Sequence, residues 1–178
     1  AALWLVGPSA SGKSSAAKLK AQELSLAEDG WVLIDGQVFR DVHRGFAAAC
    51  ADGLEKDCVW RDAYEQLRSM INEEKRRLLK VALRRRQHLV IPHTCLNLKA
   101  CIEQVRTLKR KGYVCHIVGL CGDRAELCER GRRRALIEGK RYEPREYDTS
   151  LQSLAPMLAE CNGVYEVLCT TDADRRFR

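Results

Sequence analysis

An eight-residue segment near the start of the chain limits the possible folds more than any other feature. Residues 7–14 read GPSASGKS and match GxxxxGK[ST], the phosphate loop of nucleotide-binding proteins. A strongly apolar run precedes the segment and a helical pattern follows it, which is the strand–loop–helix context that this motif requires. The residues expected to contact a nucleotide are Gly7, Ser9, Ala10, Ser11, Gly12, Lys13 and Ser14.

The chemistry of this loop favours ATP with Mg²⁺ as its ligand. Glycines allow backbone N–H groups to converge on phosphate oxygens, and a helix that starts near Lys13 adds the positive end of its dipole. Lys13 is then expected to reach the β- and γ-phosphates, and Ser14 to bind Mg²⁺. A plain Gly/Ser turn would not explain why a lysine and a hydroxyl stand together at that corner. ATP is preferred over GTP because the sequence has no N-K-x-D guanine motif.

Short apolar runs alternate with longer helical patterns over the rest of the chain. Strands are expected at residues 3–6, 31–35, 88–92, 113–120 and 164–169, and helices at 13–27, 59–86, 98–111, 124–138 and 151–161. This alternation predicts a three-layer α/β fold around a five-stranded, mainly parallel sheet. No repeat or Pro/Gly-rich linker interrupts it, so residues 1–178 are expected to form a single domain. No apolar run is long enough to span a bilayer.

Charge and cysteine content narrow the partners and the compartment. The net charge of +7 favours anionic partners such as nucleotides, sugar phosphates or nucleic acid. The nine cysteines include no CxxC pair, which is not a zinc pattern, and we expect them to be reduced, buried thiols. A reducing intracellular compartment follows, either the cytoplasm or an organelle if a presequence has been removed.

The second expected strand leads to a family resemblance. It ends at Asp35 and continues as D-G-Q-V-F-R, followed by His43. With the phosphate loop, this segment resembles the zeta-toxin group of small-molecule kinases, with adenylylsulfate kinases as more distant cousins. Weaker matches extend the resemblance over nearly the whole chain: a strand ending at Thr94, a G-Y-x-V strand start at residues 112–115, arginines spaced R-x-x-x-R and a G-K-R-x-x-P turn at residues 139–144.

The resemblance implies a P-loop NTPase fold of the nucleotide-kinase type, with strand order 2-3-1-4-5. It also implies transfer of the ATP γ-phosphate to a hydroxyl of a polar acceptor, with UDP-N-acetylglucosamine as the first candidate. The catalytic residues it implies are Lys13, Asp35, Arg130, Arg134 and Arg141, with Ser14 and Asp35 as Mg²⁺ ligands. The substrate contacts it implies are Gln37, Arg40, His43 and Thr94.

Each of these residues also has a simpler structural interpretation. Arg130 and Arg134 share one helix face and suit a lid that closes over phosphates, but Arg132, Arg133 and Arg134 could instead form a solvated basic surface. Asp35 could cap the turn into Gly36, Thr94 could cap the next helix, and His43 could pack within a loop.

Two departures from the family pattern bear on activity. Gln37 stands where the family has an Asp that accepts the acceptor's proton, and Pro92 and His93 stand where an acidic residue precedes the Thr. In an extended strand Asp35 would point to the same side as Gln37, so Asp35 could serve as the base or as a Mg²⁺ ligand. The alternative is a catalytically degenerate nucleotide-binding module that acts as a scaffold or as a subunit of a larger, RNA-containing assembly.

A basic segment at the end of the long helix offers a surface for such an assembly. Its cations are Lys75, Arg76, Arg77, Lys80, Arg84, Arg85 and Arg86. Cations near a helix C-terminus are also favoured by the helix dipole, so a solvated, helix-stabilising face is the simpler interpretation. Aromatic residues make up only 6% of the chain, which gives little support for stacking on single-stranded RNA.

Overall fold

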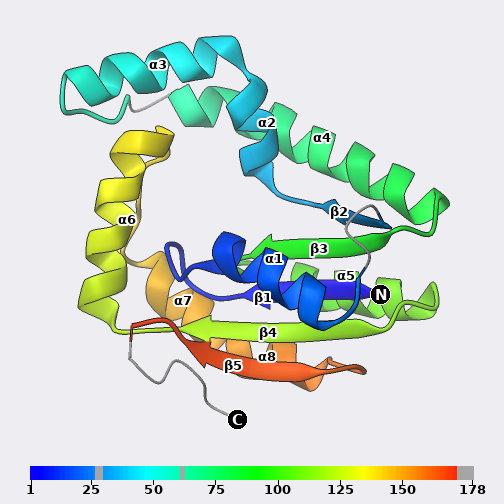
Figure 1. Ribbon diagram of the computed structural model, residues 1–178. Helices are drawn as coiled ribbons and strands as arrows, with labels where there is room; N and C mark the ends of the chain where they lie inside the picture. Colours follow the sequence, from blue (N-terminus) through cyan, green and yellow to red (C-terminus); the bar gives the residue numbers. More distant parts are fainter. Residues whose placement is uncertain (27–29, 61–62, 172–178) are drawn as a thin grey trace.

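One five-stranded parallel sheet forms the centre of the computed structural model, which describes residues 1–26, 30–60 and 63–171. The strands are β1 (Ala2–Val6), β2 (Trp31–Leu33), β3 (His88–His93), β4 (Cys115–Cys121) and β5 (Tyr165–Cys169). Their order is β2-β3-β1-β4-β5, and all four pairings are parallel (Figure 1). The predicted fold class and strand order are therefore confirmed, with β1 in the middle.

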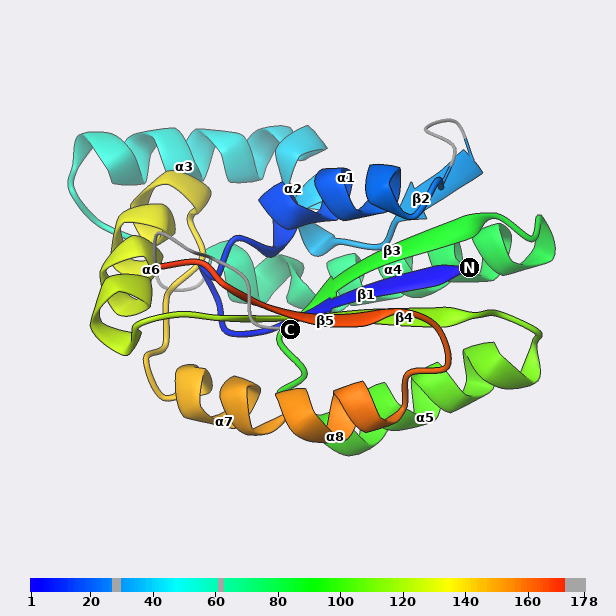
Figure 2. The ribbon, with the colours of Figure 1, turned by 60° about the horizontal axis from the view of Figure 1, so that its bottom comes forward.

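Eight helices surround this sheet in the described part of the chain. They are α1 (Lys13–Glu23), α2 (Gly36–Val42), α3 (Arg44–Glu55), α4 (Ala63–Arg84), α5 (Leu98–Arg110), α6 (Arg124–Glu138), α7 (Glu146–Gln152) and α8 (Leu154–Ala159). Figure 2 shows α1 on one face of the sheet and α5, α7 and α8 on the other. Helices α3 and α6 pack together beyond the carboxyl ends of the strands (Figure 1).

The central strand is apolar throughout because both of its faces are covered. Leu3 and Leu5 pack into a core beneath α1, whereas Trp4 and Val6 pack into the core shared with α4, α5 and α8. All five residues of β1 are fully buried. A sheet with helices on both faces requires this pattern, and it places the loop after β1 at the centre of the carboxyl edge.

The structure corrects several expected boundaries. The expected helix over residues 151–161 is two short helices, since Pro156 has no N–H for a continuous helical ladder. The junction lies at Ser153, whose hydroxyl donates to the carbonyls of Cys95 and Thr149. The strand boundaries differ by smaller amounts: β2 ends at Leu33 and β4 begins at Cys115.

Residues 36–55 were not expected to be helical, yet they form α2 and α3. The expected helix over 13–27 ends at Glu23, and residue 27 lies outside the described residues. Gly112, with φ of 82°, closes α5 as expected. The helix after Thr94 is capped by Asn97, whose side chain accepts from the N–H of Ala100, so the capping interpretation of Thr94 is wrong.

The cysteines agree in part with the sequence expectation, since five are buried and four are only partly buried. All nine are free thiols, and none is fully exposed. Within the described ranges, no helix combines the length and the apolar composition needed to cross a membrane.

Candidate nucleotide site and acceptor cleft

The phosphate loop connects the buried strand β1 to α1, and its shape depends on its glycines. A Cβ on Gly7 would lie 2.2 Å from the carbonyl oxygen of Leu120, a neighbour in the backbone of β4. Gly12 has φ of 80°, a left-handed conformation that favours glycine, and no side chain caps the N–H groups of α1 after it. The hydroxyl of Ser11 is buried without a hydrogen-bond partner. A loop with open N–H groups and an unsatisfied hydroxyl fits a bound phosphate chain.

Lys13 lies folded over this loop. Its ammonium group donates to the carbonyl oxygens of Gly7 at 2.8 Å and Pro8 at 2.5 Å. Burial lowers the pKa of Lys13 to about 7, and the charges of Arg134 and Lys140 lower it further. A phosphate group beside Lys13 would act in the opposite direction and favour the charged form.

A cleft of about 940 Å³ opens beside the loop at the carboxyl ends of the strands. Parallel α/β sheets bind ligands at this edge. The expected site residues that line it are Ser9, Lys13, Ser14, Asp35, Gln37, Arg40, Thr94, Arg134 and Arg141. Arg130 and His43 do not line it. His43 instead caps α3, where its Nδ1 accepts from the N–H of Phe46 at 3.0 Å.

Asp35 has the capping role that the sequence left open. Its carboxylate is the N-cap of α2 and accepts from the N–H of Gln37 at 3.0 Å. Gln37 is therefore in the first turn of a helix, and the argument from an extended strand is wrong. Both side chains still line the cleft, as does Ser14, so Ser14 and Asp35 offer oxygen ligands of the type that Mg²⁺ prefers.

The arginines of the expected lid lie on two sides of the loop. Arg134 of α6 pairs with Glu138 and donates to the side-chain oxygen of Gln37 at 3.2 Å. Arg130, one turn earlier, pairs with Glu126 and donates to the carbonyl of Thr170 at 3.2 Å, beyond the end of β5.

Two further arginines line the cleft, and one of them contacts α6. Arg40 is buried, and its guanidinium lies 3.4 Å from Glu138. Glu138 therefore receives cations from both α2 and α6. Arg141 is more exposed and pairs with Glu143 at 3.5 Å.

Sequence reasoning did not single out two lysines of the cleft. Burial lowers the pKa of Lys75 on α4 and of Lys140 after α6. Among the described residues neither has an ion-pair partner, although the Lys140 ammonium lies 5.3 Å from the centre of the Tyr64 ring. The signal for Lys75 was its place in the row Ile71, Lys75 and Leu79, which puts one lysine among apolar residues on a single helix face.

The end of β3 contributes a cluster of thiols and imidazole. Pro92 and His93, which replace the expected acidic residue, line the cleft together with Cys101. The hydrogen bond with Cys95 lowers the pKa of the Cys101 thiol to about 5, and the same coupling raises the pKa of Cys95.

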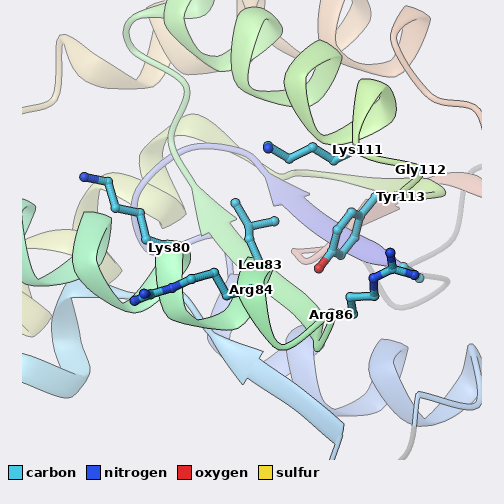
Figure 3. A pocket seen from close by; sticks show the side chains of 8 residues that line it. Lys80, Leu83, Arg84, Arg86, Lys111, Gly112 and Tyr113 are labelled. Carbon is cyan, nitrogen blue, oxygen red and sulfur yellow. The ribbon is translucent and has the colours of Figure 1, made fainter.

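A second hollow of about 950 Å³ lies at the opposite edge of the sheet, near the amino ends of β3 and β4 (Figure 3). Its side chains include Lys80, Leu83, Arg84, Arg86, Lys111 and Tyr113. The basic helix α4 is thus divided. Lys75 and Arg76 line the nucleotide-side cleft, whereas Lys80 and Arg84 line the distal hollow.

Comparison with known proteins decides the family. A model of the zeta toxin family matches residues 1–160. The chain belongs to the zeta toxin family. This confirms the resemblance inferred from the phosphate loop and the D-G-x-x-F-R segment, and it gives the protein a P-loop, kinase-like nucleotide-binding function.

Solved structures agree on the fold of this zeta toxin family member. A structure from the PezAT chromosomal toxin–antitoxin system of Streptococcus pneumoniae matches with a TM-score of 0.71 and 18% identity, covering 98% of this chain and 69% of that one. A candidate kinase from Chloroflexus aurantiacus matches with a TM-score of 0.57 and 18% identity, covering 98% and 90%. A search of curated proteins gave no significant match.

Proposed function

We propose that residues 1–178 act as one kinase domain that moves the γ-phosphate of ATP to a hydroxyl of a small anionic acceptor. A nucleotide sugar such as UDP-N-acetylglucosamine is the first candidate. The observation that carries the proposal is the pairing of two features in one cleft: a phosphate loop on one side, and on the other the half-buried cations Lys75 and Lys140, which have no ion pair among the described residues. Burial lowers the pKa of both lysines, and an anionic ligand would stabilise their charged forms.

On the nucleotide side, the loop N–H groups and Lys13 would hold the phosphates. Lys13 would exchange its bonds to the carbonyls of Gly7 and Pro8 for bonds to phosphate oxygens. Ser14 would hold Mg²⁺ and Asp35 would help to orient it, and the ion when bound supplies positive charge to the β- and γ-phosphates. The N-cap bond of Asp35 to Gln37 uses one of the two carboxylate oxygens and leaves the other for the cleft.

Arg134 and Arg141 would neutralise the negative charge of the transferred phosphoryl group from the cleft side. Arg130 would do so from the side of β5. Phosphoryl transfer depends mainly on positioning and on charge neutralisation, so three cations around one loop suit it. Glu138 holds Arg134 in place now, and the phosphates would compete with this carboxylate for the guanidinium.

On the acceptor side, Gln37, Arg40 and Thr94 would contact the acceptor, with Lys75 and Lys140 on its anionic part. His43 is removed from this set because it caps α3. Asp35 is the carboxylate next to Gln37 and is our choice for the group that takes the proton of the acceptor hydroxyl.

The test is ADP release by purified protein given ATP, Mg²⁺ and a panel of nucleotide sugars, sugar phosphates and neutral sugars. We expect release that depends on an anionic acceptor and disappears in Lys13→Ala. The exposed Lys18→Ala on α1 is the matched control and should remain active. Release that is equal with and without every acceptor would reject the proposal.

A second candidate function is a nucleotide-binding subunit without transfer activity. The contact between Arg134 and Gln37 favours it, because a lid arginine there meets an amide that cannot accept a proton. The distal basic hollow would then be a surface for RNA or for another subunit. ATP binding without acceptor-dependent ADP release would select this function.

A further inference from the structure

Three soft or borderline metal ligands meet where β3 joins α5. His93 ends β3, Cys95 follows two residues later, and Cys101 lies in the first turns of α5. One ligand atom from each of the three lies within 4.8 Å of the other two. The sequence alone does not indicate this group, because its spacing, H-x-C-x5-C, resembles no common zinc pattern.

We propose that His93, Cys95 and Cys101 form a zinc site with three protein ligands and one open position facing the acceptor cleft. Two thiolates and a neutral imidazole suit Zn²⁺, and two thiolate charges balance the dication, so the buried site would carry no net charge. Binding requires both sulfurs as thiolates and releases the proton of each thiol that still carries one. The proposal does not depend on phosphate transfer.

The distance between two of the ligands already fits tetrahedral coordination, and the sulfur of Cys95 lies within 4.8 Å of both. Nδ1 of His93 lies 3.5 Å from Sγ of Cys101. With Zn–S near 2.3 Å and Zn–N near 2.0–2.1 Å, two ligands of a tetrahedral ion stand roughly 3.5 Å apart. The ion would therefore fit between these two atoms with little movement of the backbone.

The burial of the three residues decides where the open position lies. Cys95 is fully buried behind the site, whereas His93 and Cys101 line the cleft. The fourth position therefore faces the cleft, where water or an oxygen of a ligand can occupy it. Three protein ligands and one open position are the arrangement of catalytic zinc sites, in contrast to closed structural sites.

The surrounding structure holds the ligands in place. Cys95 has φ of 52°, which is uncommon for a residue with a side chain, and its carbonyl accepts from Ser153. The ring of Trp4 lies edge-on to His93 at 6.2 Å. A backbone that its surroundings hold in an uncommon conformation is typical of functional sites.

One hydrogen bond must change when the metal binds. The N–H of Cys95 donates to Nδ1 of His93 at 2.9 Å, which keeps that nitrogen unprotonated toward the two sulfurs. Zinc would take the same lone pair, and the N–H of Cys95 would turn to a thiolate sulfur. The small shift required is a rotation of the His93 ring.

Cobalt titration tests the site without any nucleotide. Reduced, metal-free protein titrated with Co²⁺ should develop thiolate-to-cobalt charge-transfer absorption and tetrahedral ligand-field bands that saturate at one ion per chain and disappear when Zn²⁺ is added. Cys101→Ser should lose at least about tenfold in affinity. Cys58→Ser is the matched control, because this thiol lies outside the cluster, and it should titrate like the native protein.

A second measurement covers variants that fold poorly. Zn²⁺ should protect Cys101, the thiol of the cluster that lines the cleft, from alkylation in the native protein, as mapped by mass spectrometry, while leaving Cys58 reactive. Three results would each overturn the proposal: no tetrahedral spectrum, an unchanged spectrum in Cys101→Ser, or alkylation of Cys101 that Zn²⁺ does not slow. In those cases the cluster would be a pair of hydrogen-bonded thiols.

Discussion

Arg134 donates a hydrogen bond to the side-chain oxygen of Gln37 across 3.2 Å and so joins the lid helix α6 to the first turn of α2. The same guanidinium pairs with Glu138, which also holds Arg40. The lid side of the cleft is therefore linked to the acceptor side before any ligand is present. The residue that the family uses as a base is here an amide that serves as an acceptor for this arginine.

Changing Gln37 to Asp tests whether the missing base limits transfer. Gln37→Asp should raise acceptor-dependent ADP release by about 10², because a positioned general base contributes about 10² to 10⁴ in rate. Gln37→Ala, which removes the contact with Arg134 without adding a carboxylate, should bring no gain. An unchanged rate in Gln37→Asp, with ATP binding intact, would show that Gln37 is not at the site of proton transfer.

Asp35 has two duties that two substitutions separate. Asparagine caps a helix about as well as aspartate, so Asp35→Asn should fold normally but lower turnover by about 10² with little change in ATP affinity. Asp35→Ala should in addition lose about 1 kcal/mol of unfolding free energy, measured with denaturant, because α2 loses its cap. Full turnover in Asp35→Asn would mean that the carboxylate only caps.

ATP binding should take up a proton near neutral pH. The pKa of Lys13 in the free protein is about 7, below its ordinary value of 10.5, so Lys13 is mostly neutral at pH 8. Phosphates favour the charged form, and affinity should therefore fall as pH rises above 7. Calorimetry at pH 8 in two buffers of different ionisation enthalpy should give different apparent binding enthalpies. Lys13→Arg, charged at every pH, should remove the difference, and an equal enthalpy for native protein would contradict the prediction.

Two lysines of α4 provide a matched pair for the acceptor site. Lys75→Met should raise the KM for an anionic acceptor about tenfold or more, since one charge-assisted hydrogen bond is lost, and should leave the KM for ATP unchanged. Thermal stability without ligand should not fall, because a half-buried cation that has no ion pair among the described residues is removed. Lys80→Met changes the same helix at the distal hollow and should leave both KM values as they are. The same change in KM for both variants would place the acceptor elsewhere.

Gly7 should tolerate no side chain. Gly7→Ala brings a Cβ against the backbone of Leu120, and we expect a loss of at least about 2 kcal/mol in unfolding free energy, measured with denaturant. Gly45→Ala in α3 is the control, since its Cβ would meet only the His43 ring at 3.4 Å, and stability should change little. Similar losses in both variants would refute the packing argument.

The sequence predicted the sheet because its signals are local. Each strand is a short apolar run bounded by polar residues, and the loop motif fixes the end of β1. The α2–α3 segment was missed because Gly36, Gly45 and Gly53 lower its intrinsic helix propensity, and tertiary packing of α2 on α4 and of α3 on α6 stabilises it. Long-range packing of this kind is not visible in the local sequence pattern.

The same contrast between local and long-range signals applies to the residues of the candidate site. Lys13, Asp35 and Arg134 belong to recognisable segments, were predicted from them and line the cleft, whereas Lys140 and the His93–Cys101 pairing depend on which elements the fold brings together. His43 had the expected spacing, yet its side chain is used within its own helix. Spacing along the chain selects residue types, and only the folded backbone decides which of them face the same space.

The tight approach of Gly7 to the backbone of β4 has a consequence for how such chains diverge. A descendant that stopped transferring phosphate could replace Lys13 without disturbing the sheet, but replacing Gly7 would disturb the central strands. Gly7 would therefore be kept even after phosphate transfer was lost. Among distant members of the family, a glycine at the first position of the loop therefore indicates that the fold is kept. A lysine six residues later is the better indication of a working enzyme.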